Sequence, residues 1–158
     1  MIRLNLGCGK DILEDYDNID IRKLHHSVII ADVCNLPYEL ESVDEIRAID
    51  IYEHISFLKS EELINHWVSL LKPGGKLVIQ TTDSHSLANM ILKSSDIRQT
   101  EESIRRIFGG QEYEENTHKT IGDINLLKFY LFLSGVRKSI KVYTGFGNGT
   151  NFKIVAIK

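Results

Sequence analysis

Short apolar runs and longer helical patterns alternate along this chain. The short runs predict strands at residues 2–6, 18–21, 28–31, 43–51, 76–82, 140–144 and 152–157. In the helical patterns apolar residues recur at every third or fourth position, after Ser60 and again after Asp123, two residues that can cap a helix. Because strand and crossover alternate up to residue 82, we expect a mainly parallel sheet.

The segment at residues 84–122 interrupts this alternation. It contains two short helical patterns, at 86–92 and 100–108, and Thr100 is the expected cap of the second. The polar stretch 111–120 has no periodicity and is predicted to be a loop. Because the segment follows the fifth strand at the carboxyl edge of the sheet, it can cover a ligand crevice, and we interpret it as a substrate lid.

The last two predicted strands are joined by a glycine-rich sequence, GFGNGT at residues 145–150. Such a joint predicts an antiparallel hairpin. The 158 residues of the chain are close to the usual size of one domain. We therefore expect a single domain over residues 1–158, with 84–122 as its lid insertion.

Composition and charge exclude several classes of protein. The chain is 42% hydrophobic and 26% charged, which is typical of a soluble globular protein, and its net charge of −3 gives no basic footprint for an obligate nucleic-acid partner. The apolar run 124–136 is interrupted by Lys128 and too short to span a membrane, and the N-terminus enters a strand without a signal peptide. Cys8 and Cys34 lack the spacing of a zinc site. We expect a cytoplasmic protein with no membrane partner and no metal site.

The first predicted strand ends in two glycines, Gly7 and Gly9, within LNLGCGK at residues 4–10. A glycine turn at the carboxyl end of a strand lets a ligand approach the backbone, and Asp20, at the end of the next strand, can bind a ribose diol. Ile12 stands where a dinucleotide fingerprint has its third small residue, and the acidic loop around it disfavours a pyrophosphate. These features predict a site for a nucleoside that carries a positive charge and no phosphate.

Five segments occur in the order and spacing of known motifs. They are LNLGCGK (4–10), NID (18–20), ADVCNLPY (31–38), IYEHI (51–55) and LKPGGKLVI (71–79). Together they resemble the successive motifs of class I S-adenosylmethionine-dependent methyltransferases. The resemblance implies an α/β three-layer sandwich with a seven-stranded, mostly parallel sheet and an antiparallel C-terminal hairpin. It also implies the cofactor S-adenosyl-L-methionine and the product S-adenosyl-L-homocysteine.

The same resemblance implies a set of cofactor-binding residues. They are Asn5, Leu6, Gly7, Cys8, Gly9, Asp20, Ile21, Asp32, Val33, Asp50 and Ile51. Asp20 would accept hydrogen bonds from the ribose hydroxyls, Asp32 would accept one from the adenine amine, and Asp50 lies where the family holds the methionine group. Each has a plainer alternative, because Asp20 and Asp32 can be turn residues and Asp50 an exposed strand end. A carboxylate facing an open crevice, as expected for Asp20, makes few contacts within the protein. Asn5 stands where many family members carry an acidic residue.

Two histidines are candidates for a catalytic base. His54, in YEHI, and His118, in the 111–120 loop, lie at the predicted edges of the crevice. A neutral imidazole can take a proton from a substrate hydroxyl or amine, and the alternative for His54 is that it braces its own loop. FGGQ at 108–111, followed by His118 and Lys119, resembles the cap region of methyltransferases that modify glycans or natural products.

The function expected from these features is transfer of a methyl group to a small-molecule or glycan-like acceptor, at oxygen or nitrogen. A non-catalytic protein that binds S-adenosylmethionine or another nucleoside is the alternative, because the connection after the first strand is too short for a full crossover helix. An NAD(P)-dependent oxidoreductase is disfavoured by Ile12 and by the acidic loop.

Overall fold

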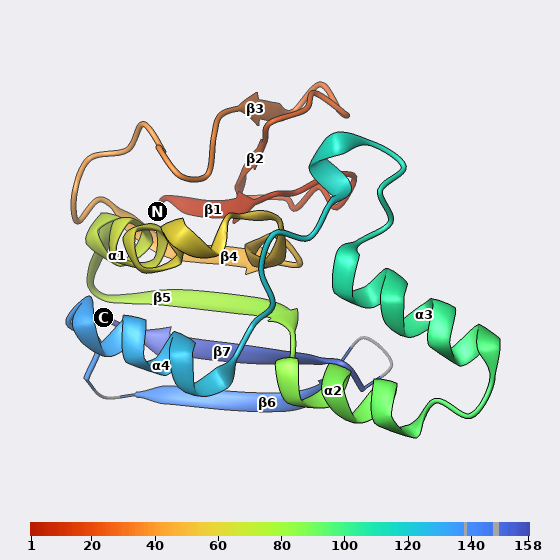
Figure 1. The fold of residues 1–158 in the computed structure, drawn as a ribbon. Coiled ribbons are helices and arrows are strands. Elements are labelled where there is room, and N and C mark those ends of the chain that lie inside the picture. The colour runs from red at the N-terminus through yellow and green to blue at the C-terminus, as the bar shows by residue number, and fades with distance from the viewer. Residues whose placement is uncertain (138, 147–148) are drawn as a thin grey trace.

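The computed structural model describes residues 1–137, 139–146 and 149–158 and contains one seven-stranded sheet, in the order β3-β2-β1-β4-β5-β7-β6 (Figure 1). The strands are β1 (Arg3–Leu6), β2 (Asp17–Asp20), β3 (Val28–Ile30), β4 (Val43–Ile49), β5 (Leu71–Thr82), β6 (Ile140–Phe146) and β7 (Asn151–Ile157). The first five pair in parallel, and β7 runs antiparallel to both β5 and β6. The mostly parallel α/β sheet with a C-terminal hairpin is therefore confirmed, although positions 147–148 of the expected hairpin turn lie outside the described residues.

The described helices follow the predicted order. They are η1 (Tyr52–His54), η2 (Phe57–Lys59), α1 (Ser60–Leu70), α2 (Ser84–Lys93), α3 (Ile97–Phe108), η3 (Glu114–Asn116) and α4 (Ile124–Leu133). Asp123 caps α4 as expected, since its carboxylate accepts hydrogen bonds from the backbone N–H groups of Asn125 and Leu126 at 2.9 and 3.0 Å. None of the helices in the described part of the chain is long and apolar enough to cross a membrane.

Two predicted caps are wrong. The α1 helix begins at Ser60 itself, directly after η2, so Ser60 lies in its first turn. The α3 helix begins at Ile97, because the Asp96 carboxylate accepts bonds from the N–H groups of Arg98 and Gln99. A carboxylate four residues before the predicted cap thus caps the helix, and Thr100 lies inside it.

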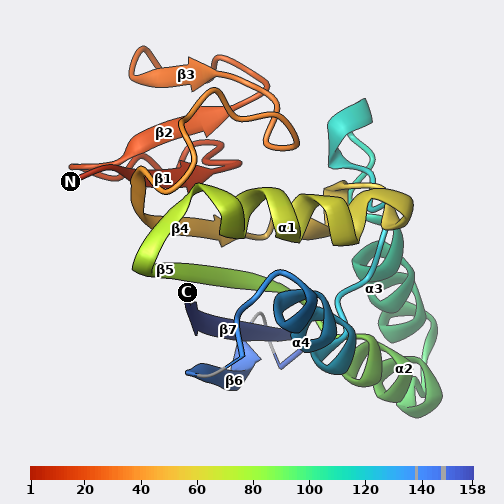
Figure 2. The same cartoon turned by 90° about the vertical axis from the view of Figure 1, so that its left-hand side faces the viewer.

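The hydrophobic core lies between the sheet and two helices. The α1 and α4 helices pack against each other on one side of the sheet (Figure 2). Strand residues in register on that side, such as Leu4, Ile46 and Leu77, are fully buried. Trp67 of α1 is also fully buried, and its indole N–H donates to the Val33 carbonyl at 2.9 Å. This bond ties the helix to the loop that follows β3.

The opposite face of the sheet is polar in its centre. Arg3, Glu45 and Lys76 lie side by side there, with Glu45 and Lys76 paired at 2.9 Å. Within the described residues the connections 7–16, 21–27 and 31–42 contain no helix. The α1 and α4 helices pack on the other face of the sheet (Figure 2).

The 84–122 segment extends beyond the carboxyl ends of the strands, where α2 and α3 form a helical hairpin (Figure 1). Its two ends lie together, because Ser84 N–H donates to the Gly122 carbonyl at 2.9 Å. The chain therefore leaves β5, passes over the edge of the sheet and returns to the same point before α4.

Candidate functional site

A cavity of about 630 Å³ lies at the carboxyl ends of the parallel strands. Ten of the predicted site residues line it: Gly7, Gly9, Asp20, Ile21, Asp32, Val33, Asp50, Ile51, His54 and His118. They come from the end of β2, from the segments that follow β1, β2, β3 and β4, and from the returning part of the 84–122 segment. The structure thus brings the two predicted histidines and most of the predicted cofactor residues to one place.

Asn5, Leu6 and Cys8 lie behind this lining. Leu6 belongs to the core, and Cys8 is buried, which raises the pKa of its thiol to about 11. The Asn5 amide donates to the Asp11 carbonyl at 2.7 Å and to Asn18 Oδ1 at 2.9 Å. Asn5 therefore holds the β1–β2 loop against the helix-free face of the sheet. A direct cofactor contact from these three residues stays a prediction.

The two glycines of the first turn have different roles. Both have a positive φ, +61° at Gly7 and +54° at Gly9. A Cβ atom on Gly7 would lie 2.6 Å from the Ile51 side chain, so the absence of a side chain there permits close packing of the turn on the end of β4. A Cβ on Gly9 would meet nothing within 4 Å among the described residues. Gly9 is therefore the position where a ligand can approach bare backbone.

Asp20 is more constrained than the sequence suggested. Its residue is only 6% exposed, and its carboxylate accepts the N–H of Gly9 at 2.9 Å and the N–H of Arg22 at 2.8 Å. The expectation of few internal contacts is wrong, because the carboxylate joins the turn after β1 to the turn after β2. A carboxylate has about four acceptor positions, so this arrangement leaves capacity for a diol.

Asp32 is a turn residue that also lies at the cavity. Its carboxylate accepts the N–H of Cys34 at 2.9 Å, as in a turn, and the residue also lines the cavity. Val33, next to it, is buried, and its carbonyl is the acceptor for Trp67. The turn is therefore fixed from the core side while its outer edge faces the cavity.

Asp50 has a left-handed backbone, with φ +51°, directly after β4. The residue is exposed toward the cavity, and two amide groups from neighbouring strands hold its carboxylate. The amide of Asn151 donates to Oδ1 at 2.9 Å, and the amide of Gln80 lies 3.3 Å from both oxygens. Asn151 could not be predicted from the sequence, because its contact with Asp50 depends on the antiparallel pairing of β7 with β5.

His54 and His118 face each other across the cavity lining. Their ring centroids are 4.9 Å apart, with an edge-to-face angle of 79°. His54 Nδ1 lies 3.3 Å from the Thr117 carbonyl, and His118 Nδ1 lies 3.0 Å from the Arg106 carbonyl. Because a carbonyl only accepts, each Nδ1 carries a hydrogen, and each neutral ring keeps a basic Nε2. Burial lowers the pKa of both imidazoles, which favours that neutral form.

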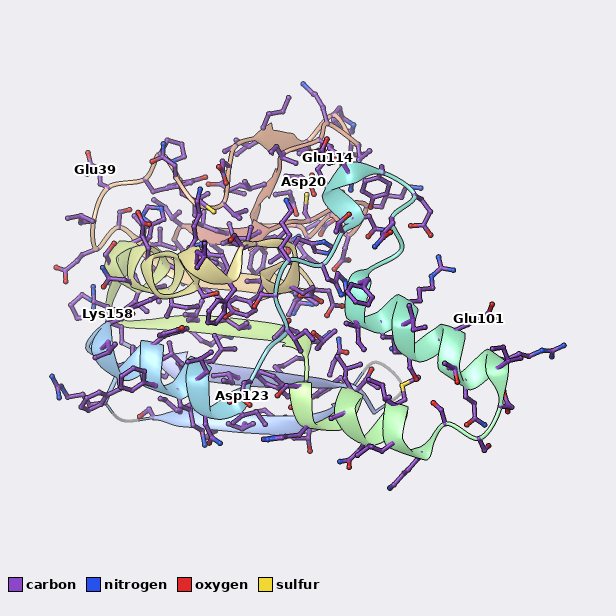
Figure 3. All side chains as sticks on the ribbon, viewed as in Figure 1. Asp20, Glu39, Glu101, Glu114, Asp123 and Lys158 are labelled. Carbon is purple, nitrogen blue, oxygen red and sulfur yellow. The ribbon has the colours of Figure 1, made fainter. Side chains whose placement is uncertain are left out.

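Two residues at the rim of the cavity were missed in the sequence. The Arg22 guanidinium lies over the Tyr113 ring, 4.1 Å from its centroid, and 3.7 Å from Asp20. Figure 3 shows Asp20 beneath the η3 turn that carries Glu114. Arg22 follows β2 and Tyr113 precedes η3, so their contact closes the cavity between two distant segments.

Glu53 was also missed as a link between the sheet and the returning segment. Its carbonyl accepts the N–H groups of Lys119 and Thr120 at 2.7 and 3.1 Å. Its carboxyl group is buried, accepts the Thr81 hydroxyl at 2.8 Å, and has a pKa raised by that burial to about 7. Asp50 nearby acts in the same direction on this pKa.

Comparisons with known proteins support the fold. No protein-family model matches the chain. An uncharacterized protein of Methanocaldococcus jannaschii is 29% identical over 97 residues, which are 53% of this chain and 42% of that protein. A SAM-dependent methyltransferase of Archaeoglobus fulgidus superposes over 99% of this chain and 85% of its own, with a TM-score of 0.68 and 16% identity. One of Thermotoga maritima superposes over 99% and 82%, with a TM-score of 0.69 and 15% identity.

The chain therefore has the class I SAM-dependent methyltransferase fold. At these identities the similarity shows the fold alone. The chain spans less than half the length of the curated relative that it matches.

Proposed function

We propose that this chain binds S-adenosyl-L-methionine and transfers its methyl group to a small-molecule or glycan-like acceptor, at oxygen or nitrogen. The observation that carries the proposal is the cavity that joins the glycine turn, the Asp20 carboxylate and the paired histidines. S-adenosylmethionine supplies a methyl group already activated by its sulfonium, so the protein needs to bind, orient and exclude water.

The residues of the cavity fit this ligand. Gly9 leaves open space at the backbone, and Asp20 keeps acceptor capacity for a ribose diol. Asp50, held by Gln80 and Asn151, presents a negative charge to a cationic group. No step requires a phosphate site, which agrees with the acidic first loop.

Proton removal is assigned to His118 or His54. The carbonyl partners of Nδ1 leave Nε2 of each ring able to accept a proton from an acceptor hydroxyl or ammonium group. Since burial lowers the pKa of both rings, the base form persists at neutral pH. Activity should fall when acid protonates the rings, at pH values below the range in which histidine ordinarily titrates.

We also propose that residues 84–122 act as the substrate lid of a single domain that spans the chain. Its position supports this role. The two ends of the segment, Ser84 and Gly122, lie next to each other, and its returning part lines the cavity. A lid in this place would exclude water from the acceptor and the methyl group.

A non-catalytic S-adenosylmethionine-binding protein is the second candidate. The observation that favours it is the missing helical layer, since loops 7–16 and 21–27 replace crossover helices beside the cofactor side of the cavity. Release of S-adenosylhomocysteine in the presence of acceptor candidates separates the two functions. Binding without release across a broad acceptor panel would favour the second.

Calorimetric titration with S-adenosylmethionine and S-adenosylhomocysteine tests the shared part of both functions. We expect micromolar binding, or about −8 kcal/mol. Absence of heat and of any thermal shift at millimolar ligand would refute the cofactor assignment. The matched control is Asp20→Ala, which should bind much more weakly.

A further inference from the structure

A second cavity, of about 420 Å³, adjoins the first. It lies between α3 and the ends of β5 and β7, and Asn116 and His118 belong to the linings of both cavities. The Asp50 carboxylate lines the first cavity and accepts the amide of Asn151, which lines the second. The second cavity therefore ends at the candidate base, on the side away from Asp20.

The lining of this cavity is polar. Among the described residues it contains no aliphatic or aromatic side chain except the His118 imidazole. Glycines, the Thr82 hydroxyl and charged or amide groups form the rest, including Arg105 and Arg106 of α3. Binding sites for apolar acceptors are lined mainly by hydrophobic side chains, so this lining disfavours an apolar or aromatic acceptor.

Thr82 supplies an independent sign of a ligand. The residue is 5% exposed, and its hydroxyl is buried without a hydrogen-bond partner among the described residues. It lines the second cavity beside Asn151, its partner in the β5–β7 register. A buried hydroxyl is normally paired, and a polar group bound in the cavity would provide the missing partner.

The two arginines are held in place at the opposite wall. Arg106 pairs with Glu102 at 2.8 Å and donates to the Thr150 hydroxyl at 2.9 Å, and Arg105 pairs with Glu112. A guanidinium has five donors in a planar fork that matches a carboxylate or a phosphate. Carboxylate pairing therefore orients these groups without making them unsuitable for an anionic ligand.

We propose that the second cavity is the acceptor subsite and that it selects a polar acceptor with an anionic group, a carboxylate or a phosphate. Arg105 and Arg106 bind the anionic group, Thr82 hydrogen-bonds to the acceptor, and the hydroxyl or amine to be methylated lies at His118. This assignment rests on the proposed methyltransferase function and adds the substrate class to it.

Anion titration of the cofactor-free protein tests the subsite. Inorganic phosphate and acetate are added separately while NMR follows the ring of His118 and the methyl group of Thr82. We expect saturable shifts at both positions with at least one anion and none at Ile21, which lines the first cavity only. A response to phosphate alone indicates a phosphorylated acceptor, and a response to acetate alone indicates a carboxylate. No saturable shift with either anion overturns the proposal.

Matched arginine variants locate the anion. Arg105→Gln and Arg106→Gln should each weaken binding of the responding anion by about tenfold, because each removes a charge-assisted donor. Arg98→Gln, on the same helix but outside this lining, should bind like the wild type. Arg105 is more exposed than Arg106, so Arg105→Gln remains informative where Arg106→Gln fails to fold. Equal weakening by all three variants would overturn the assignment.

Thr82→Val separates a ligand contact from a packing fault. Valine fills the same space without the unpartnered hydroxyl, so the melting temperature should stay constant or rise while anion binding weakens several-fold. Unchanged anion binding overturns the role of this hydroxyl.

Titration of Arg105→Gln with S-adenosylhomocysteine distinguishes the two proposals. Normal cofactor binding with lost anion binding supports the subsite, whereas anion binding in a protein that never binds the cofactor refutes the methyltransferase function.

Discussion

The first cavity has two walls that the chain builds in different ways. The sheet wall consists of Gly7 and Gly9 after β1, Asp20 at the end of β2 and Asp50 after β4. The insertion wall consists of residues 113–119, which return from α3. The sheet wall is fixed by hydrogen bonds between the ends of different strands, whereas the insertion wall is attached by a few contacts, such as Lys119 N–H to the Glu53 carbonyl.

This difference predicts different consequences of mutation. Substitutions in the sheet wall should alter the fold and cofactor affinity together, because the same groups do both tasks. Substitutions in the insertion wall should alter rates of ligand exchange with little effect on global stability, since segments with few contacts open locally. The following variants test that division, from the largest expected effect to the smallest.

Gly7→Val should have the largest effect. The new Cβ would lie 2.6 Å from Ile51, and the φ of +61° is strained for a β-branched residue. We expect a loss of about 4 kcal/mol in the free energy of unfolding, measured by denaturant titration. Gly9→Ala is the matched control, since its φ is similar but its Cβ is unobstructed, and it should lose only about 1–2 kcal/mol. Equal losses would contradict the different roles of the two glycines.

Asp20→Ala should weaken cofactor binding by about 2–4 kcal/mol, or roughly thirty-fold or more, because it removes the acceptors proposed for the ribose. It should also lower stability by about 1–2 kcal/mol, since the N–H groups of Gly9 and Arg22 lose their acceptor. Asp20→Asn should lie between Ala and wild type. Calorimetry with S-adenosylhomocysteine and thermal melts measure both effects, and unchanged affinity would refute the ribose role.

The sheet wall could be predicted from sequence because of a simple geometric rule. Successive parallel strands end at the same edge of a sheet, so Gly9, Asp20 and Asp50 meet once the strands are recognised. The internal contacts of Asp20 could not be predicted, because they depend on which backbone N–H groups the turns direct toward it. The absence of a helix in the loop 7–16 could be predicted, because this connection is too short for a full crossover helix.

The insertion wall was less accessible to prediction. Its polar sequence carries no periodicity that would fix its path, so the meeting of His54 with His118 and of Arg22 with Tyr113 had no local signal. Residue chemistry and motif position alone indicate His54 and His118 as candidates. Their side-by-side placement comes from hydrogen bonds to the backbone at Thr117 and Arg106, which only the folded chain brings near.

Glu53→Gln tests the junction between the two walls. Burial raises the pKa of the Glu53 carboxyl from 4.5 to about 7, so between these values the folded protein holds a proton that the unfolded chain has lost. Stability should therefore fall by about 3 kcal/mol as the pH rises through this range. In Glu53→Gln that part of the pH dependence should disappear. The stability of the variant relative to the wild type should therefore be highest at about pH 8. Parallel stability curves for the two proteins would contradict the assignment.

The smallest effect is expected at the Arg22–Tyr113 contact, where the insertion wall meets the loop after β2. A cation over an aromatic face contributes about 0.5–2 kcal/mol, so Tyr113→Leu should speed S-adenosylhomocysteine dissociation by about fivefold while the melting temperature changes little. Tyr113→Phe keeps the ring and should dissociate like the wild type. Arg22→Met also removes the guanidinium that lies 3.7 Å from Asp20, so it should dissociate at least as fast as Tyr113→Leu. The double variant should be no faster than Arg22→Met, because the contact with Tyr113 is already lost. Stopped-flow displacement measures these rates. Additive rate increases, or a Phe variant as fast as the Leu variant, would show that this contact does not hold the insertion wall closed.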